Sequence, residues 1–227
     1  MKTVVISLGG SVMIPDKINF SFLDKFKRLL EKNSRTAKFV IVTGGGSVAR
    51  KYIQALKEEG KGEKELSRAG IRVTRLNALF LMQFFGKGTN SNLPLDMEHV
   101  KNDLRKNKIV ICGALRYDDK ETSDGTAAKL ANYLKSDFVN ITNVAGLFDK
   151  DPRKHRDAKF IPEISWKDFE KIADKMKFKA GQHFVLDQMA AKLIRKHKIR
   201  TVIVGPDISN LNNLFNGRKF KGTRIEG

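Results

Sequence analysis

The stretch TVVISLGGSV, residues 3–12, joins a short apolar segment to two consecutive glycines, Gly9 and Gly10. The apolar segment is rich in β-branched residues on both of its faces, as expected of a strand covered by helices on both sides. A second segment of this kind, FVIVTGGGSVAR at residues 39–50, ends in three glycines and leads into an amphipathic stretch. Glycines let a backbone approach a ligand closely, and the free N–H groups of a helix start bind phosphate. The two stretches predict an α/β protein with phosphate-binding turns at its strand ends.

A third turn of this type lies in ICGALRYDDKETSDGT, residues 111–126, where a predicted strand ends in Gly113 and Ala114. The polar loop that follows leads to TSD at residues 122–124, which opens a predicted helix. In open α/β sheets, ligands bind beyond the carboxyl ends of the strands, where these three turns would meet. Neither a P-loop nor a G-x-G-x-x-G fingerprint follows a predicted strand, so phosphoryl chemistry would need another scaffold.

Apolar segments alternate with amphipathic ones along the whole chain, which is typical of an α/β protein with a largely parallel sheet. We predict strands at residues 3–8, 39–43, 109–112, 138–142 and 201–204. We predict helices at residues 20–32, 47–59, 63–85, 97–106, 124–135, 166–175 and 184–197. No internal repeat and no Pro/Gly/Ser-rich linker divides the chain. We therefore expect one domain over residues 1–227 that is made of two lobes, residues 1–135 and 136–227.

Composition excludes several classes of protein. The longest apolar stretch, residues 78–85, contains Gln83, whereas a membrane span needs about 20 apolar residues. The first residues turn to glycine too soon for a secretory signal. The single cysteine, Cys112, excludes an intramolecular disulfide and a zinc site built on cysteines. We therefore expect a soluble, cytoplasmic protein.

The chain is strongly basic, with 44 Lys and Arg against 25 Asp and Glu among 227 residues and a net charge of +19. Such a charge attracts nucleotides, nucleic acid and acidic lipid alike. Its basic residues are scattered and interleaved with acidic ones. Two interpretations stay open: a solvated surface rich in Lys and Glu, as in heat-adapted proteins, or real affinity for polyanions.

Four segments occur in a fixed order along the chain: SLGGSV (7–12), TGGGSVARKY (43–52), SDGTAA (123–128) and ITNVAGLFDKDP (141–152). Together they resemble the amino acid kinase superfamily. Three more segments are similar to its archaeal-type UMP kinase branch: GIRVTRLNA (70–78), KDPRKHRDAKFI (150–161) and VLDQMAAKLI (185–194). The resemblance covers essentially the whole chain. It implies an αβα sandwich around a mostly parallel sheet, with an acceptor-binding lobe at 1–135 and an ATP-binding lobe at 136–227. It also implies ATP and Mg²⁺ as cofactors and a homohexamer. The implied reaction is transfer of a phosphoryl group from ATP to UMP in pyrimidine nucleotide biosynthesis.

The resemblance also implies roles for individual residues. The implied ATP-binding residues are Gly9, Gly10, Ser11, Gly46, Arg50, Thr142, Asn143, Phe148 and Asp151. The implied UMP-binding residues are Gly45, Ser67, Gly113, Ala114, Thr122 and Ser123. The implied catalytic residues are Asp124, Lys192 and Arg50, and no residue is assigned as a metal ligand. Asp124 would organise the cationic groups, while Lys192 would neutralise charge on the transferring phosphoryl group. Phosphoryl transfer depends mainly on in-line positioning and charge neutralisation, which glycine N–H groups, Arg and Lys supply.

Several positions depart from the family pattern, mostly on the acceptor side. The family's GGTxPGxTTD-like loop reads GALRYDDKETSD here, and it gains the charged residues Arg116, Asp118, Asp119 and Glu121. Ser67 stands where an acidic ribose-binding residue is expected, with Glu65 as a stand-in. The family's TNVDGVY is TNVAGLF, and a lysine common in the first strand is Ser7.

These departures keep alternatives open. The same fold could phosphorylate another small phosphate or carboxylate, or the chain could bind a nucleotide or nucleic acid without catalysis. Lys192 could be a solvated lysine and Asp124 an ordinary helix cap. Arg72 and Arg75 could lie at a subunit interface or near the acceptor phosphate. The apolar stripe along residues 76–84 fits either the core or an oligomer interface.

Overall fold

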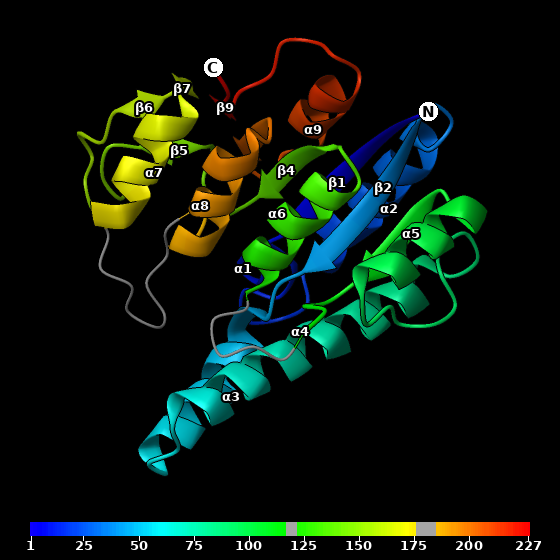
Figure 1. Ribbon diagram of the computed structural model, residues 1–227, viewed down its shortest axis with the longest axis horizontal. Coiled ribbons are helices and arrows are strands. Elements are labelled where there is room, and N and C mark those ends of the chain that lie inside the picture. Colours follow the sequence, from blue (N-terminus) through cyan, green and yellow to red (C-terminus); the bar gives the residue numbers. More distant parts are fainter. Residues whose placement is uncertain (117–121, 176–184) are drawn as a thin grey trace.

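The chain folds around a central sheet with helices on both faces (Figure 1). The computed structural model describes residues 1–116, 122–175 and 185–227. Within these ranges the sheet has seven strands in the order β3-β2-β1-β4-β8-β9-β7. Its strands are β1 (Lys2–Leu8), β2 (Ala37–Thr43), β3 (Ile109–Cys112), β4 (Asp137–Ile141), β7 (Glu163–Ile164), β8 (Thr201–Val204) and β9 (Thr223–Ile225). A separate two-stranded sheet pairs β5 (Leu147–Phe148) with β6 (Phe160–Ile161).

The sheet is parallel from β3 to β8, and only its far edge reverses. The pairs β2–β3, β1–β2, β1–β4 and β4–β8 are all parallel. Strand β9 then runs antiparallel to β8, and β7 runs parallel to β9. Because β1, β2, β3 and β4 point the same way, their carboxyl ends lie at one edge of the sheet. The three glycine turns follow β1, β2 and β3 and therefore lie at this edge.

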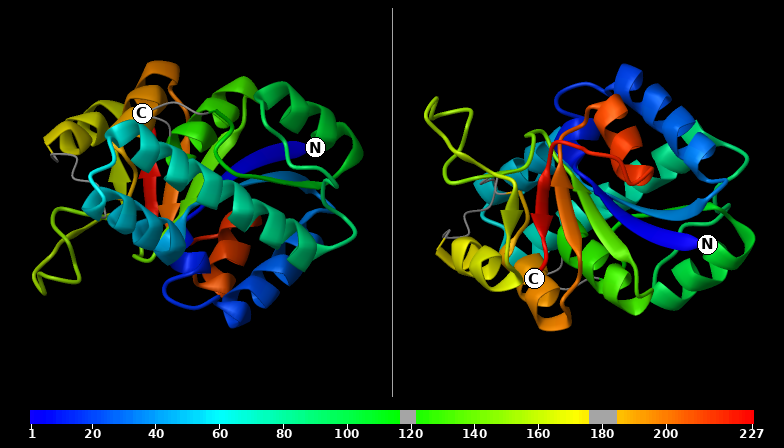
Figure 2. Two further views of the ribbon diagram at one scale, coloured as in Figure 1. Left: turned by 90° about the horizontal axis from the view of Figure 1, so that it is seen from below. Right: turned by 90° about the horizontal axis from the view of Figure 1, so that it is seen from above.

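The helices form the two outer layers. They are α1 (Gly10–Met13), α2 (Phe20–Asn33), α3 (Gly46–Glu58), α4 (Glu63–Phe85), α5 (Met97–Lys106), α6 (Ser123–Tyr133), α7 (Trp166–Lys175), α8 (Gln188–His197) and α9 (Ile208–Phe215). Figure 2 shows the sheet between α2 and α9 on one side and α6 and α8 on the other. Alternate residues of each strand face the two layers: Val4 and Ile6 pack with α2 and the end of α4, while Val5 packs with α5 and α6. The sheet is therefore buried on both faces.

Helix α4 is the longest element, and only its second half packs on the sheet. Its residues Ala78, Leu81, Met82 and Phe85 belong to the core beside α2. Its first half lies beside α3, and this pair extends past the sheet (Figure 1). The middle of α4 consequently passes the carboxyl ends of β2 and β3.

The predicted fold class is confirmed, and the predicted elements match the observed ones closely. The predicted helix at 184–197 begins too early, because Val185 and Leu186 precede the helix and Asp187 caps it by accepting from Ala190 N at 2.8 Å. Its first residue, Phe184, lies outside the described residues. The predicted helix at 124–135 is Ser123–Tyr133, with Thr122 as its cap. Elements that sequence reasoning missed are α1, α9, β5, β6, β7 and β9.

Candidate functional site

The first two glycine turns touch each other at the carboxyl edge of the sheet. Gly9 N donates to Ile141 O at 2.9 Å, and Gly44 N donates to Leu8 O at 2.9 Å, so each turn continues the sheet hydrogen bonding. A Cβ atom on Gly10 would lie 2.0 Å from Gly46 N, a distance that no real side chain allows. Gly46 itself has φ +64°, which favours glycine. The Gly10 and Gly46 backbones meet only because both lack side chains.

Helix α3 begins at this contact with its first N–H groups uncapped by any side chain. Gly45 is the N-cap, and the first turn contains no acidic residue. The side chain of Ser47 is buried, and its Oγ has no hydrogen-bond partner among the described residues. Buried hydroxyl groups are nearly always satisfied, and a helix start of this kind binds anions. Arg50, one turn further on, is exposed and makes one long contact, from Nη2 to Pro15 O at 3.4 Å.

A carboxylate, Asp124, joins the start of α6 to β1. The hydroxyl of Ser7, fully buried on β1, donates to Asp124 Oδ1 at 2.6 Å. Thr122 caps α6 by accepting from Gly125 N at 2.9 Å, and its own hydroxyl donates to Asp187 Oδ2. Burial raises the pKa of Asp124 to about 7; the nearby negative charge of Asp187 also raises it, while the Ser7 hydrogen bond opposes the shift. The starts of α6 and α8 are therefore joined around a carboxylate that titrates near neutral pH.

The third turn is fastened to α4. Ala114 N donates to Thr74 Oγ1 at 3.0 Å, and Arg75 Nε donates to Ala114 O at 2.9 Å. A Cβ atom on Gly113 would lie 2.7 Å from Arg75 N. One turn later on the same helix, Asn77 Nδ2 donates to Gly44 O at 2.8 Å. A single segment of α4 thus holds both turns that the sequence assigns to the acceptor.

The residues predicted for the nucleoside end of the ATP pocket follow β4 and β5. Thr142 N donates to Val204 O at 3.0 Å, and the Asn143 side chain is exposed. The Phe148 ring lies 5.3 Å from the ring of Phe160 in a T-shaped pair. The Asp151 carboxylate is bound by the Arg153 guanidinium through two hydrogen bonds of 3.0 and 2.9 Å, and that contact lowers its pKa to about 2.

Other predicted residues lie apart from these contacts. The Lys192 side chain is 62% exposed, and its Nζ lies 3.9 Å from Asp174 Oδ1. Among the described residues, no hydrogen bond or ion pair joins Lys192 to the glycine turns. Ser67 is half-buried on α4, and Ser11 is half-buried on α1. Of the added charges in the 113–124 loop, Arg116 is exposed, whereas residues 118, 119 and 121 lie outside the described ranges.

Sequence reasoning gave no site role to Ser7, Asn77 or Asp187. Asn77 had a detectable signal, because it is a polar residue on the apolar face of α4 and is only 4% exposed. Asp187 had a weaker signal, since an Asp immediately before a helix is a common N-cap residue. Ser7 was noted only for lacking the lysine of related chains, and nothing in the sequence pairs it with Asp124.

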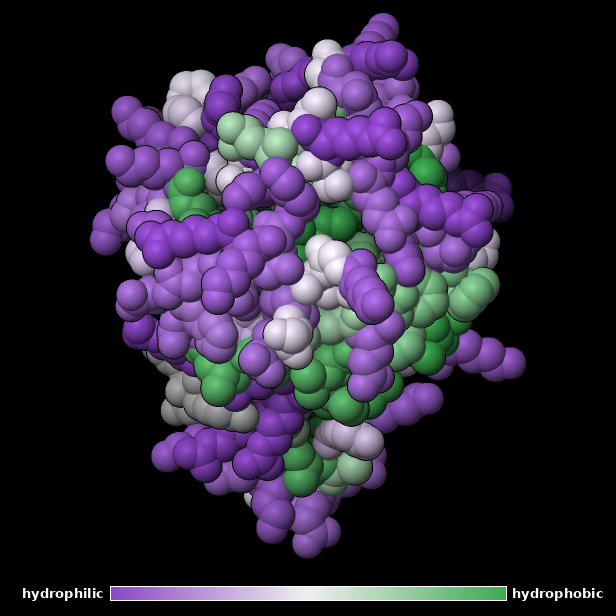
Figure 3. Space-filling model, turned by 90° about the vertical axis from the view of Figure 1, so that its right-hand side faces the viewer, coloured by the Kyte–Doolittle hydropathy of each residue, from purple (hydrophilic) through white to green (hydrophobic). Residues whose placement is uncertain are grey.

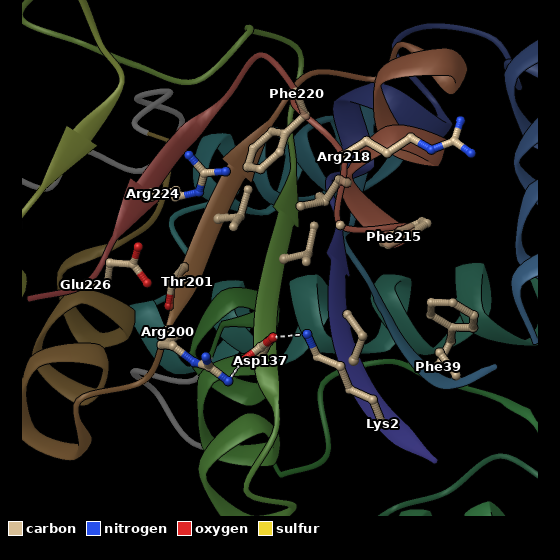
Figure 4. A pocket seen from close by; sticks show the side chains of 16 residues that line it. Lys2, Phe39, Asp137, Arg200, Thr201, Phe215, Arg218, Phe220, Arg224 and Glu226 are labelled. Carbon is tan, nitrogen blue, oxygen red and sulfur yellow. Dashed lines mark ion pairs between the residues drawn. The ribbon is translucent and has the colours of Figure 1, made fainter.

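A cavity of about 230 Å³ opens at the opposite edge of the sheet, where the strands begin (Figure 4). Lys2 and Arg200 both turn toward Asp137, with N–O distances of 2.5 and 2.9 Å. The Arg224 guanidinium lies 4.6 Å from the centre of the Phe220 ring. These cations already meet a carboxylate or an aromatic ring, and no residue predicted for the site lines this cavity.

In the described part of the chain, no helix has the length and apolar composition of a membrane span. The same residues include no group of three or more His, Cys, Asp or Glu side chains that could hold a metal ion.

Comparisons with known proteins point in one direction. The model of the amino acid kinase family matches residues 2–205. Uridylate kinases of Thermococcus kodakarensis and Thermococcus sibiricus are 37% and 36% identical, over 98% of this chain and 99% of theirs. The crystal structure of uridylate kinase from Archaeoglobus fulgidus superposes with a TM-score of 0.85 at 31% identity, covering 99% of this chain and 100% of that one. The structure of UMP kinase from Ureaplasma parvum, at 20% identity and a TM-score of 0.81, shares the fold.

Proposed function

The chain belongs to the amino acid kinase family, and we propose on that basis that it is a UMP kinase. It transfers the γ-phosphoryl group of ATP to UMP and releases ADP and UDP, a step of pyrimidine nucleotide biosynthesis. The observation that carries this proposal is the similarity to uridylate kinases, which covers at least 98% of this chain. The enzyme is thus a nucleoside monophosphate kinase, a phosphotransferase.

The phosphates would bind where the first two glycine turns meet. Gly9, Gly10 and Ser11 form one side of this place, and Gly46 begins the helix on the other. The start of α3 has no side-chain cap, and the Ser47 hydroxyl has no partner among the described residues, although the Ser47 N–H already donates to Ile14 O at 3.1 Å. Donors that are fixed in place before the reaction stabilise the charge of a transferring phosphoryl group without reorganisation. Arg50 lies within the same helix, and its single long contact leaves the guanidinium available for a phosphate.

The acceptor would lie toward the second and third turns. Gly45, Gly113 and Ala114 present backbone groups there, and Thr122 and Ser123 open α6 beside them. Ser67 on α4 would be the polar group nearest the ribose. The helix dipole at the start of α6 favours an anion such as a nucleoside monophosphate, although Gly125 N already donates to the Thr122 hydroxyl.

Asp124 would orient the cationic groups around the reacting phosphates. Its carboxylate is held by Ser7 at 2.6 Å, so its position is fixed by β1. Lys192 would have to leave Asp174 to reach a phosphoryl group, because its Nζ now lies 3.9 Å from that carboxylate. We therefore place more of the charge neutralisation on Arg50 and on backbone N–H groups than on Lys192.

The donor set suits ATP and Mg²⁺ in one specific way. Mg²⁺ commonly binds through one or two carboxylates together with substrate phosphates and water, so it needs no three-residue cluster. Among the described residues, the Asp124 carboxylate is bonded to Ser7 on β1, and the Asp187 carboxylate is bonded to Thr122 at the start of α6. Mg²⁺ would supply neutralisation of charge on the β- and γ-phosphates. Thr142, Asn143, Phe148 and Asp151 would line the nucleoside end of ATP.

The assembly and location belong to the same proposal. Leu76 and Leu79 on α4 are 55% and 42% exposed, whereas Phe80 and Phe84 of the same stripe pack against the core. Figure 3 shows apolar groups gathered over part of an otherwise polar face. Exposed apolar side chains of this size favour a subunit interface, in line with a homohexamer. A cytoplasmic location fits an enzyme that draws on the cell's ATP and UMP.

A second candidate keeps the fold and changes the acceptor. Its support is the 113–124 loop, which lacks the second glycine and the Pro-Gly of the family pattern and carries added carboxylates. Carboxylates near an anionic acceptor repel it unless they point to solvent. A different small phosphate or carboxylate would then replace UMP.

The experiment that tests the proposal follows the phosphoryl group itself. Purified protein is incubated with Mg-ATP and UMP, and the products are identified by ³¹P NMR. The proposal expects the β-phosphorus signal of UDP to grow as the γ-phosphorus signal of ATP falls. Loss of ATP without UDP, or no reaction while ATP still binds, would contradict it.

A further inference from the structure

One turn of α4 holds both acceptor turns, and this arrangement goes beyond the residues that touch substrate. Residues 74–77, here called the α4 clamp, hydrogen-bond to the Gly44–Gly45 turn and to the Gly113–Leu115 turn. These turns end neighbouring strands, because Val42 pairs with Cys112 in the sheet. The clamp therefore bridges the two loops whose separation defines the acceptor site.

Asn77 binds the second turn, Gly44–Gly45, through two carbonyl oxygens. Its Nδ2 donates to Gly44 O at 2.8 Å and to Gly45 O at 3.2 Å, and the side chain is only 4% exposed. In a planar trans peptide the N–H points opposite to the C=O of the same unit. Drawing both carbonyl oxygens toward α4 consequently turns the N–H groups of Gly45 and Gly46 away from it. These N–H groups have no acceptor among the described residues.

Thr74 and Arg75 bind the third turn at the N–H and the C=O group of Ala114. Thr74 Oγ1 accepts from Ala114 N at 3.0 Å, and Arg75 Nε donates to Ala114 O at 2.9 Å. Arg75 Nη2 also donates to Leu115 O at 2.7 Å. The Gly113 backbone lies so close to α4 that a Cβ atom there would be 2.7 Å from Arg75 N. This close packing prevents the turn from moving toward the helix, and the three hydrogen bonds prevent it from moving away.

A further bond connects the two turns through the clamp. Thr43, fully buried at the end of β2, donates from Oγ1 to Thr74 O at 2.8 Å and approaches Cys112 O at 3.4 Å. Buried hydrogen bonds of this kind are costly to leave unmade, so they hold geometry more firmly than surface contacts do.

We propose that Thr74 and Asn77 are positioning residues for the acceptor: they set the distance and orientation of the two turns, and thereby the affinity for UMP, without touching it. This inference rests on the proposed function. Misplacement of binding groups by a fraction of an ångström weakens a bound substrate strongly. The affinity for ATP should change much less when Thr74 is replaced, because no residue assigned to ATP belongs to the Gly113–Leu115 turn.

The test compares Thr74→Val, which keeps the side-chain shape and removes the acceptor, with Thr74→Ser, which keeps the hydroxyl. Asn77→Ala is compared with Asn33→Ala, since Asn33 is also buried and donates to a backbone carbonyl, Leu29 O at 2.8 Å, away from the turns. The expected result is a rise of about tenfold in KM for UMP in Thr74→Val and Asn77→Ala, which is the loss of about one hydrogen bond's worth of binding. KM for ATP should change less than about twofold in Thr74→Val, and Thr74→Ser and Asn33→Ala should stay near wild type.

A second measurement keeps the inference separate from the identity of the acceptor. Amide exchange by NMR should show the Ala114 N–H exchanging at least about tenfold faster in Thr74→Val than in Thr74→Ser, because only the first variant removes its acceptor. If wild-type protein does not phosphorylate UMP, the proposed function fails while the exchange result still decides the positions of the turns. Equal KM changes in Asn77→Ala and Asn33→Ala, or unchanged exchange at Ala114, would overturn the clamp.

Discussion

The Ser7 hydroxyl donates a 2.6 Å hydrogen bond to Asp124 Oδ1, which joins the central strand β1 to the start of α6. Many members of the superfamily carry a lysine at the position of Ser7, as the sequence resemblance implies. In this chain a neutral donor faces the carboxylate instead. Asp124 is therefore left without a lysine partner from β1, and its pKa rises to about 7 through burial and the charge of Asp187.

The first prediction concerns stability against pH. The folded-state pKa of Asp124, about 7, lies above its ordinary value of 3.8, so the folded protein binds the proton more tightly than the unfolded chain does. Below about pH 4 both states are protonated and the group contributes nothing. As pH rises from about 4 to 7 the unfolded chain releases the proton first, so the free energy of unfolding falls. Asp124→Asn should flatten this slope in denaturant titrations between pH 4 and 8.

Two further variants should move the midpoint of that slope in opposite directions. Ser7→Ala removes the hydrogen bond that lowers the pKa of Asp124, so the midpoint should shift to higher pH. Asp187→Asn removes the negative charge that raises the pKa, so the midpoint should shift to lower pH. Shifts in the same direction for both variants would contradict the assignment of this titration to Asp124.

The second prediction concerns the contact between the first two turns. Gly10→Ala would place a Cβ atom 2.0 Å from Gly46 N, so it should destabilise the protein by about 3 kcal/mol or more and abolish activity. Gly60→Ala is the matched control. Gly60 has φ +75°, but nothing lies within 4 Å of a Cβ atom there, so only the backbone cost of about 1–2 kcal/mol applies. Denaturant unfolding measures both; equal losses would mean that the turns are not in contact.

The third prediction concerns Arg50. Because the one hydrogen bond that Arg50 makes to the described residues is long and exposed, Arg50→Ala should leave stability within about 0.5 kcal/mol of wild type. Loss of a charge-assisted contact to phosphate should lower kcat/KM by about 10–150-fold. Lys51→Ala, an exposed neighbour on the same helix, should change kcat/KM by less than about twofold. If the two variants behave alike, Arg50 does not contact a phosphate.

The fourth prediction concerns Lys192. With its side chain 62% exposed and near Asp174, Lys192→Ala should cost little stability. A lysine that neutralises the transferring phosphoryl group would lower kcat by about 100-fold or more when removed. Lys196→Ala, on the same helix, serves as control. A kcat for Lys192→Ala within about threefold of that control would show that Lys192 is a solvated lysine and would remove it from the site.

Much of the fold follows from strong local patterns in the sequence. Strands β1 and β2 are short, rich in β-branched residues and followed by glycines, and α4 has apolar residues at helical spacing over many turns. The predictions for these elements therefore match the structure. Helix α9 was not predicted because its sequence, ISNLNNLF, is rich in asparagine, which has a low helix propensity. The N-cap at Asp207 and packing beside α2 compensate for this low propensity. Strands β7 and β9 are two and three residues long, too short to show alternation.

The site was predictable to the extent that it lies at strand ends. Parallel strands bring their carboxyl ends to one edge, so the proximity of the Gly9–Gly10 and Gly44–Gly46 turns follows from the order of elements. The side-chain contacts did not follow. Ser7 and Asp124 are separated by 117 positions in the chain, and Asn77 reaches back 33 positions to Gly44. Pairings of this kind depend on how helices dock on the sheet, which periodicity does not encode.

The most direct test of the account is an acceptor panel in a coupled assay of ADP release. Wild-type protein with Mg-ATP is compared with UMP, CMP, AMP, GMP and no acceptor. The account predicts turnover with UMP at a kcat/KM at least about 100-fold above that for each other nucleotide, because the acceptor turns are fixed in place around one ligand. Turnover of another acceptor above that of UMP, or no turnover with any nucleotide while ATP binds, would contradict it.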